Sequence, residues 1–157
     1  YSINRGLWGT SVGGEETLTS HKALPDTAYP SQLQQTEPTQ LKLTFHKGEL
    51  IAVDGDNDTP VNNIIKLEAI ASKYAIGRDI HVGDTIIGIK GRVGFEAPAS
   101  LIIIKAHHLL EKHTLTKWQQ YQKEMQRHLY PLPILHNTGR RTLVNRGAAS
   151  PLSCVVQ

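Results

Sequence analysis

The sequence has one cysteine, one methionine, few aromatic residues (6%) and no apolar run near the length of a membrane helix. Because Cys154 has no second cysteine, an internal disulfide and a zinc ribbon are both excluded. A membrane helix needs about 20 consecutive apolar residues, so a spanning segment is excluded as well. These absences favour a globular protein of the cytosol with no membrane partner.

The position of the methionine is also informative. The chain opens at Tyr1 and its only methionine is Met125, and no signal peptide is recognisable at the front. We therefore expect a piece of a longer protein. Its 157 residues are enough for one domain and too few for two ordinary ones.

Acidic residues are missing from the C-terminal part. Residues 125–157 contain four arginines and no Asp or Glu, which leaves 13 basic and 14 acidic residues in 1–124. A basic tail can touch phosphates, but four scattered arginines without an aromatic stacking platform are a weak nucleic-acid signal. We expect no nucleic-acid partner.

The hydrophobic pattern predicts an α+β fold with short antiparallel strands and packed helices. The first forty residues are rich in Gly, Ser, Thr, Pro and Gln, which predicts a long loop lying against something else. The later pattern predicts these elements in order: strands 41–45 and 50–53, a helix capped by Thr59 and ended by Gly77, strand 84–90, and helices 98–112 and 116–129. The run Ile102–Ile104 leaves strand open for part of 98–112.

Two motifs suggest ligand loops and fail on spacing. Asp54, Asp56 and Asp58 start like a calcium loop, but the sixth and twelfth positions lack the required Gly and Glu, so a solvated turn is favoured. Gly88, Gly91 and Gly94 follow neither the dinucleotide nor the P-loop order, which favours tight backbone turns. We expect no cofactor site here.

Histidines gather near the end of the predicted helix 98–112. His107 and Glu111 are four residues apart and share a face, whereas His108 and His113 are five apart and do not. Without a third converging ligand, a solvated helix face is favoured over zinc, and no metal site is predicted. No nucleophile elbow, HExxH motif or catalytic acid pair is recognisable, so we assign no catalytic residue.

Four ordered segments resemble one enzyme family. They are 1–14 (YSINRGLWGTSVGG), 47–53 (KGELIAV), 70–78 (IASKYAIGR) and 87–98 (IGIKGRVGFEAP). Together they resemble the C-terminal synthetase region of argininosuccinate synthase, over residues 1 to about 126. The resemblance implies a partial synthetase and multimerisation domain at 1–126, with the N-terminal ATP-pyrophosphatase domain absent from this chain.

The resemblance also implies an activity for the full-length enzyme. The ureido oxygen of citrulline attacks the α-phosphorus of ATP to give citrullyl-AMP and pyrophosphate, and the amine of aspartate then displaces AMP. It implies that ATP and Mg2+ are bound mainly by the absent domain and that the enzyme is a homotetramer. This chain alone is expected to be inactive, supplying part of the citrulline site and subunit contacts.

The resemblance carries four residues into the citrulline site: Ser2, Ser11, Asp84 and Phe95. A serine hydroxyl both donates and accepts hydrogen bonds, which suits an amino-acid ligand, although such serines also satisfy loop backbone groups. The family's glutamate position falls on Gly83, with Asp84 beside it as a shifted carboxylate, and its tyrosine position on Phe95. Asp84 as a turn residue and Phe95 as core remain the alternative.

Other matching residues receive no site role. Lys90, Arg92, Arg78 and Glu96 lie inside the matching motifs, and pairing of an arginine with the glutamate is the interpretation we favour. Residues 127–157 do not resemble the family and are interpreted as an atypical tail, disordered or read from a shifted frame. The rival to a ligase part is a non-catalytic binding or interaction module that kept the scaffold.

Overall fold

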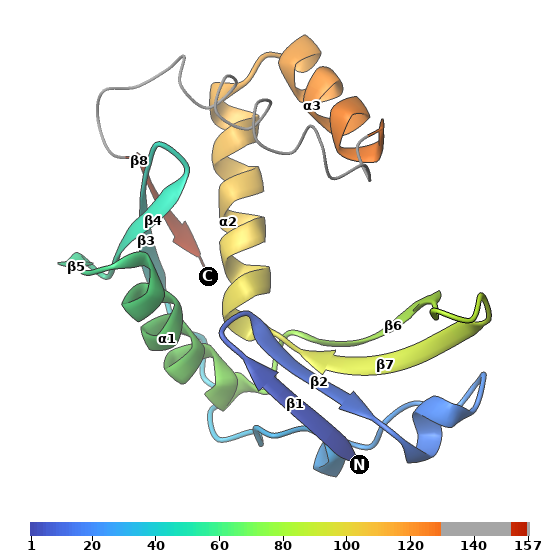
Figure 1. Ribbon diagram of the computed structural model, residues 1–157. Coiled ribbons are helices and arrows are strands. Elements are labelled where there is room, and N and C mark those ends of the chain that lie inside the picture. Colours follow the sequence, from blue (N-terminus) through green and yellow to red (C-terminus); the bar gives the residue numbers. More distant parts are fainter. Residues whose placement is uncertain (130–151, 157) are drawn as a thin grey trace. The chain divides into compact units, whose positions relative to one another are not determined.

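The computed structural model describes residues 1–129 and 152–156, which fall into two compact units (Figure 1). Unit 1 comprises 1–39 and 59–103, and unit 2 comprises the described residues of 40–58 and 104–157. Each unit contains a four-stranded antiparallel sheet, and helices accompany both. The predicted α+β class is confirmed.

The sheet of unit 1 has the strand order β1-β2-β7-β6 (Figure 1). Its strands are β1 (Ser2–Gly6), β2 (Gly9–Gly13), β6 (Arg78–Asp84) and β7 (Lys90–Glu96). The prediction of a loop over the first forty residues was therefore wrong for β1 and β2. The glycines of these strands weaken the local strand signal. β2 is stabilised instead by its pairing with β7, which is more than 80 residues away in sequence.

The predicted strand 84–90 was also wrong, because Thr85–Ile89 is the turn of the β6–β7 hairpin. The amide of Gly88, at φ +82°, donates to the carbonyl of Thr85 at 2.9 Å, and the amide of Thr85 donates to the carbonyl of Ile89 at 2.9 Å. Ile86 is fully exposed. The β-branched residues that suggested a strand sit at the tip, while the flanking segments pair with each other.

Alternation along these strands gives the sheet two different faces. The core face carries Val12 and Ile80, which pack with Leu24, Ala28 and Tyr29 of the segment that follows β2. This segment contains two short 3-10 turns, η1 (Glu15–Leu18) and η2 (Asp26–Ala28). The opposite face, called the open face below, carries the residues at odd positions of β2, β6 and β7.

Two arginines of the core face hold this segment down. The guanidinium of Arg92 donates to the backbone carbonyls of Glu16 at 3.3 Å and Lys22 at 2.8 Å, and also to that of Thr19. The backbone carbonyls of this segment have no partners in a β-sheet, and the charged guanidinium supplies the hydrogen bonds that they need. Arg92 acts as a structural clamp.

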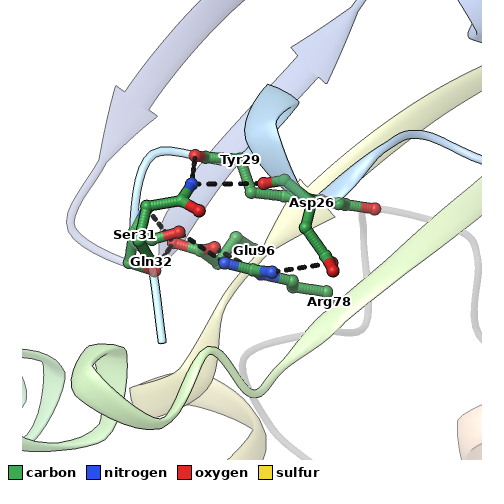
Figure 2. A network of polar contacts seen from close by, with 6 residues as sticks. All are labelled: Asp26, Tyr29, Ser31, Gln32, Arg78 and Glu96. Carbon is green, nitrogen blue, oxygen red and sulfur yellow. Dashed lines mark hydrogen bonds and ion pairs between the residues drawn. The ribbon is translucent and has the colours of Figure 1, made fainter. Parts of the chain in front are cut away.

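Arg78 clamps the next part of the segment (Figure 2). Its Nε lies 2.8 Å from Oε2 of Glu96, a second nitrogen lies 3.1 Å from Oδ1 of Asp26, and a third donates to the carbonyl of Ser31. Its guanidinium also stacks 4.6 Å from the ring centre of Tyr29. The predicted pairing of an arginine with Glu96 is confirmed for Arg78.

The helix α1 (Pro60–Ala71) begins as predicted and ends earlier. Thr59 Oγ1 accepts a hydrogen bond from the amide of Asn62 at 3.3 Å, and Pro60 opens the first turn. After Ala71 the chain continues as a 3-10 turn, η3 (Ser72–Tyr74). Left-handed Ala75, at φ 51°, closes this turn, so Gly77 is two residues beyond the cap.

The helix α2 (Pro98–Thr114) starts in unit 1 and continues into unit 2. The run Ile102–Ile104 lies within it, so the strand alternative for this run was wrong. A second predicted helix is α3 (Lys117–Leu129), which belongs to unit 2. Both helices confirm the predictions to within two residues at each end.

The sheet of unit 2 has the order β5-β4-β3-β8, made of β3 (Leu41–His46), β4 (Glu49–Val53), β5 (Asp56–Asn57) and β8 (Leu152–Val156). The predicted β3–β4 hairpin is confirmed, with positive φ at Lys47 and Gly48 as a two-residue turn requires. β8 pairs antiparallel with β3. Residues 130–151, where most of the predicted atypical tail falls, lie outside the described residues.

Candidate functional site

One row of side chains crosses all four strands on the open face of unit 1. Asn4 lies opposite Ser11, Ser11 opposite Phe95, and Phe95 opposite Asp79. Strands are about 4.8 Å apart, and directly opposed Cβ atoms are about 4.5–5.5 Å apart. An amide, a hydroxyl, a ring and a carboxylate therefore stand in one line.

A hollow of about 490 Å3 lies beside this row. Its lining includes Asn4, Ser11 and Phe95, the strand-end residues Gly6 and Gly9, Ala97 directly after β7, and the turn residues Leu7 and Trp8. Three of these lining residues, Gly6, Gly9 and Ala97, have little or no side chain. A Cβ on Gly9 would lie 2.7 Å from Cβ of Ala97 and 2.9 Å from the backbone oxygen of Glu96, so this close approach requires glycine at position 9.

The turn between β1 and β2 forms the rim of the hollow. The hydroxyl of Ser100, at the start of α2, donates to the carbonyl of Trp8 at 2.6 Å. This bond holds the turn while the indole of Trp8 stays 61% exposed. An aromatic surface thus stands at the edge of a mostly apolar hollow to which Asn4 and Ser11 add polar groups, a combination typical of small-molecule sites.

Three of the four predicted site residues fall on the open face. Ser11 and Phe95 are direct neighbours, and Ser2 stands two residues before Asn4 on β1 and so on the same face. Asn4 and Asp79 were not predicted. Their place in the row depends on strand register, and the only local signal was the alternation of Ser2 with Asn4 in a segment interpreted as loop.

Asp84 does not join this group. It ends β6, and its Oδ1 lies 2.6 Å from Nζ of Lys90, with both side chains exposed. It is five residues beyond Asp79, roughly 17 Å along the strand, and strand alternation places it on the other face. The neighbouring Gly83 is on the open face, where an added Cβ would lie 2.7 Å from Nε2 of His81.

Comparison with known proteins decides the family. The family model for the "Arginosuccinate synthase C-terminal domain" matches residues 1–134. The chain belongs to the argininosuccinate synthase family. The match extends eight residues past the boundary expected from the sequence motifs.

Individual argininosuccinate synthases agree with the family match. That of Dictyoglomus turgidum is 37% identical over 126 residues, covering 80% of this chain and 32% of the relative. That of Rubrobacter xylanophilus is 38% identical over 122 residues, covering 74% and 30%, and that of Pyrococcus furiosus is 34% identical over 122 residues, covering 75% and 30%. The chain thus spans about a third of the length of these curated relatives.

The histidine-rich part of α2 forms a polar cluster with α3. Nδ1 of His107 lies 3.2 Å from Oε1 of Glu111, and Oε2 of Glu111 is paired with Nζ of Lys123 on α3. The His107 ring packs edge-on against Phe45, with centroids 5.7 Å apart. Among the side chains that the structure describes, no three of His, Cys, Asp or Glu converge as a metal site would require.

His107 gives a pH-dependent prediction. Burial lowers its pKa from the ordinary 6.5, and the nearby Glu111 opposes this only in part. The unfolded chain then binds more protons below 6.5, so the contribution of His107 makes the fold less stable as pH falls through that value. Titration of the His107 ring signals by NMR checks this, and a midpoint at or above 6.5 would contradict it.

The helices of this chain bear on membrane insertion. None of those built from described residues combines the length and apolar character that crossing a bilayer demands.

Proposed function

We propose that this chain is the citrulline-holding part of an argininosuccinate synthase. The observation that carries the proposal is the pairing of Ser11 with Phe95 on the open face, beside the hollow and with Ser2 on the same face. These are three of the residues that family resemblance assigns to citrulline. The strand pairing supports a common site for them.

The chemistry of these side chains suits a ureido amino acid. A serine hydroxyl donates to one polar group and accepts from another, and the Phe95 ring offers an apolar surface to a hydrocarbon chain. The site has a positioning role, in which it holds the ureido oxygen in register for attack on the α-phosphorus of ATP. Orientation of this kind contributes a large share of the rate in two-substrate reactions.

In this proposal, ATP and Mg2+ are bound by the two thirds of the relatives' length that this chain does not span. The motif Gly88, Gly91 and Gly94 offers no phosphate cradle, since only Gly88 lies in a turn and the other two lie within β7. The second substrate, aspartate, and the homotetramer belong to the same proposal. A cytosolic location is consistent with the single cysteine.

Citrulline binding to the chain tests the proposal. We expect saturable binding of L-citrulline by isothermal titration calorimetry, weakened about fivefold by Ser11→Ala through loss of one hydrogen bond. Ser20→Ala is the matched control, because Ser20 is an exposed serine outside the sheet. In a second experiment the chain is mixed with ATP and citrulline, and we expect no release of pyrophosphate.

Each arm has a result that would contradict it. Absence of saturable citrulline binding by the wild-type chain would refute the proposed site. Equal losses for Ser11→Ala and Ser20→Ala would remove Ser11 from it. Pyrophosphate release by the chain alone would refute the assignment of ATP to the remainder of the enzyme.

A further inference from the structure

We infer that Asp79 is the carboxylate that binds the α-ammonium group of the amino acid held on the open face. The inference rests on the proposed citrulline site and names a specificity-determining residue within it. An α-ammonium group needs an anionic partner, since charged hydrogen bonds are the strong ones and an unpaired charge held against protein is unfavourable.

Only three carboxylates lie on the described strands of this sheet, and two of them are occupied. Glu96 is buried on the core face and paired with Arg78 at 2.8 Å. Asp84 is paired with Lys90 at 2.6 Å, near the tip of the β6–β7 hairpin. Asp79 is exposed and stands on the open face, directly opposite Phe95.

The row gives a direction to the bound amino acid. Two strand spacings, roughly 10 Å, separate Ser11 from Asp79, and the Phe95 ring lies between them. An extended citrulline fits this span with its ammonium group at Asp79, its methylene chain across Phe95 and its opposite polar end toward Ser11. Along the row the order is carboxylate, ring and hydroxyl. This order matches the ammonium group, hydrocarbon chain and ureido group along the ligand.

The Asp79 carboxylate is already held in place. Its Oδ1 accepts a hydrogen bond from the amide of Ile80 at 2.7 Å, and Ile80 itself is anchored in the core face cluster. A carboxylate fixed by its neighbour loses less freedom when it binds an ammonium group. At Gly83, by contrast, no carboxylate is present and the adjacent space holds the His81 ring.

The test compares two ligands and two aspartate variants. L-citrulline and 5-ureidopentanoate differ only in the α-amino group, so their affinity ratio reports the ammonium contact. We expect Asp79→Asn to weaken L-citrulline about tenfold or more and to leave 5-ureidopentanoate unchanged, by calorimetry on the full chain. Asp84→Asn removes the same charge from the same strand and is expected to change neither affinity.

The outcomes separate this inference from the proposed function. If the wild-type chain binds citrulline and Asp79→Asn binds it equally well, Asp79 has no such role while the proposed site stands. If the wild type binds neither ligand, the proposed site and the inference fall together. An equal loss for both ligands in Asp79→Asn would also overturn the inference, because the ammonium contact would not account for it.

Discussion

Glu96→Ala is expected to destabilise unit 1 by about 3–5 kcal/mol, the usual effect of removing one partner from a buried ion pair. The side chains of Arg78 and Glu96 are 13% and 4% exposed, so water cannot replace the lost carboxylate. Glu96 also accepts hydrogen bonds from the amide of Ser31, at 3.2 Å, and from its hydroxyl. The variant therefore loses the link between β7 and the segment that follows β2, as well as the ion pair.

Denaturant unfolding, followed by circular dichroism, measures this effect. Asp84→Asn is the matched control, since the Asp84–Lys90 pair is 70% and 69% exposed and pairs of this kind contribute about 0–1 kcal/mol. A loss from Glu96→Ala no larger than that from Asp84→Asn would show that the Arg78 clamp contributes little. The comparison separates burial from charge, because both variants remove one carboxylate from the β6–β7 hairpin.

The elements predicted from the sequence are those with local signals. The β3–β4 hairpin has alternating apolar residues around Lys47-Gly48, and α1 has Thr59 and Pro60 at its start. These features determine backbone geometry within a few residues, through side-chain alternation, turn angles and cap hydrogen bonds. They therefore predict structure without knowledge of the rest of the chain.

The elements that were missed depend on distant partners. β1 is exposed along its whole length, and β2 is held between β1 and β7. In β6 the Gly83 backbone pairs with Gly91, where neither residue has a strand preference of its own. Pairing between strands places these segments, and the local composition does not encode that pairing.

The same limit applies to the candidate site. Resemblance to a family marked Ser2, Ser11 and Phe95, which the strands bring to one face. Asp84 was chosen because it is adjacent to Gly83 in sequence, but adjacent strand residues point to opposite faces. Register instead brings Asp79 beside Phe95, a relation between positions 16 residues apart.

Gly77→Ala is expected to destabilise unit 1 by about 3 kcal/mol, from two causes that add. Gly77 has φ +78°, a left-handed conformation that costs an L-residue about 1–2 kcal/mol. An added Cβ would also lie 2.7 Å from both Cα and N of Pro98, and forcing extra atoms into a packed site costs about 1–3 kcal/mol. These are backbone atoms at the start of α2, so no side-chain rotation can relieve the contact.

Gly88→Ala isolates the conformational part of this effect. Gly88 has a similar φ of +82°, but no atom lies within 4 Å of its added Cβ. Its loss is expected to be about 1 kcal/mol, so the difference between the two variants measures the clash at Pro98. Equal losses of unfolding free energy in the two variants would mean that Gly77 and α2 can move apart with little loss of stability. That outcome is disfavoured by the hydrogen bond from the amide of Ala97 to the carbonyl of Gly77 at 2.9 Å, which ties the two segments together where β7 leads into α2.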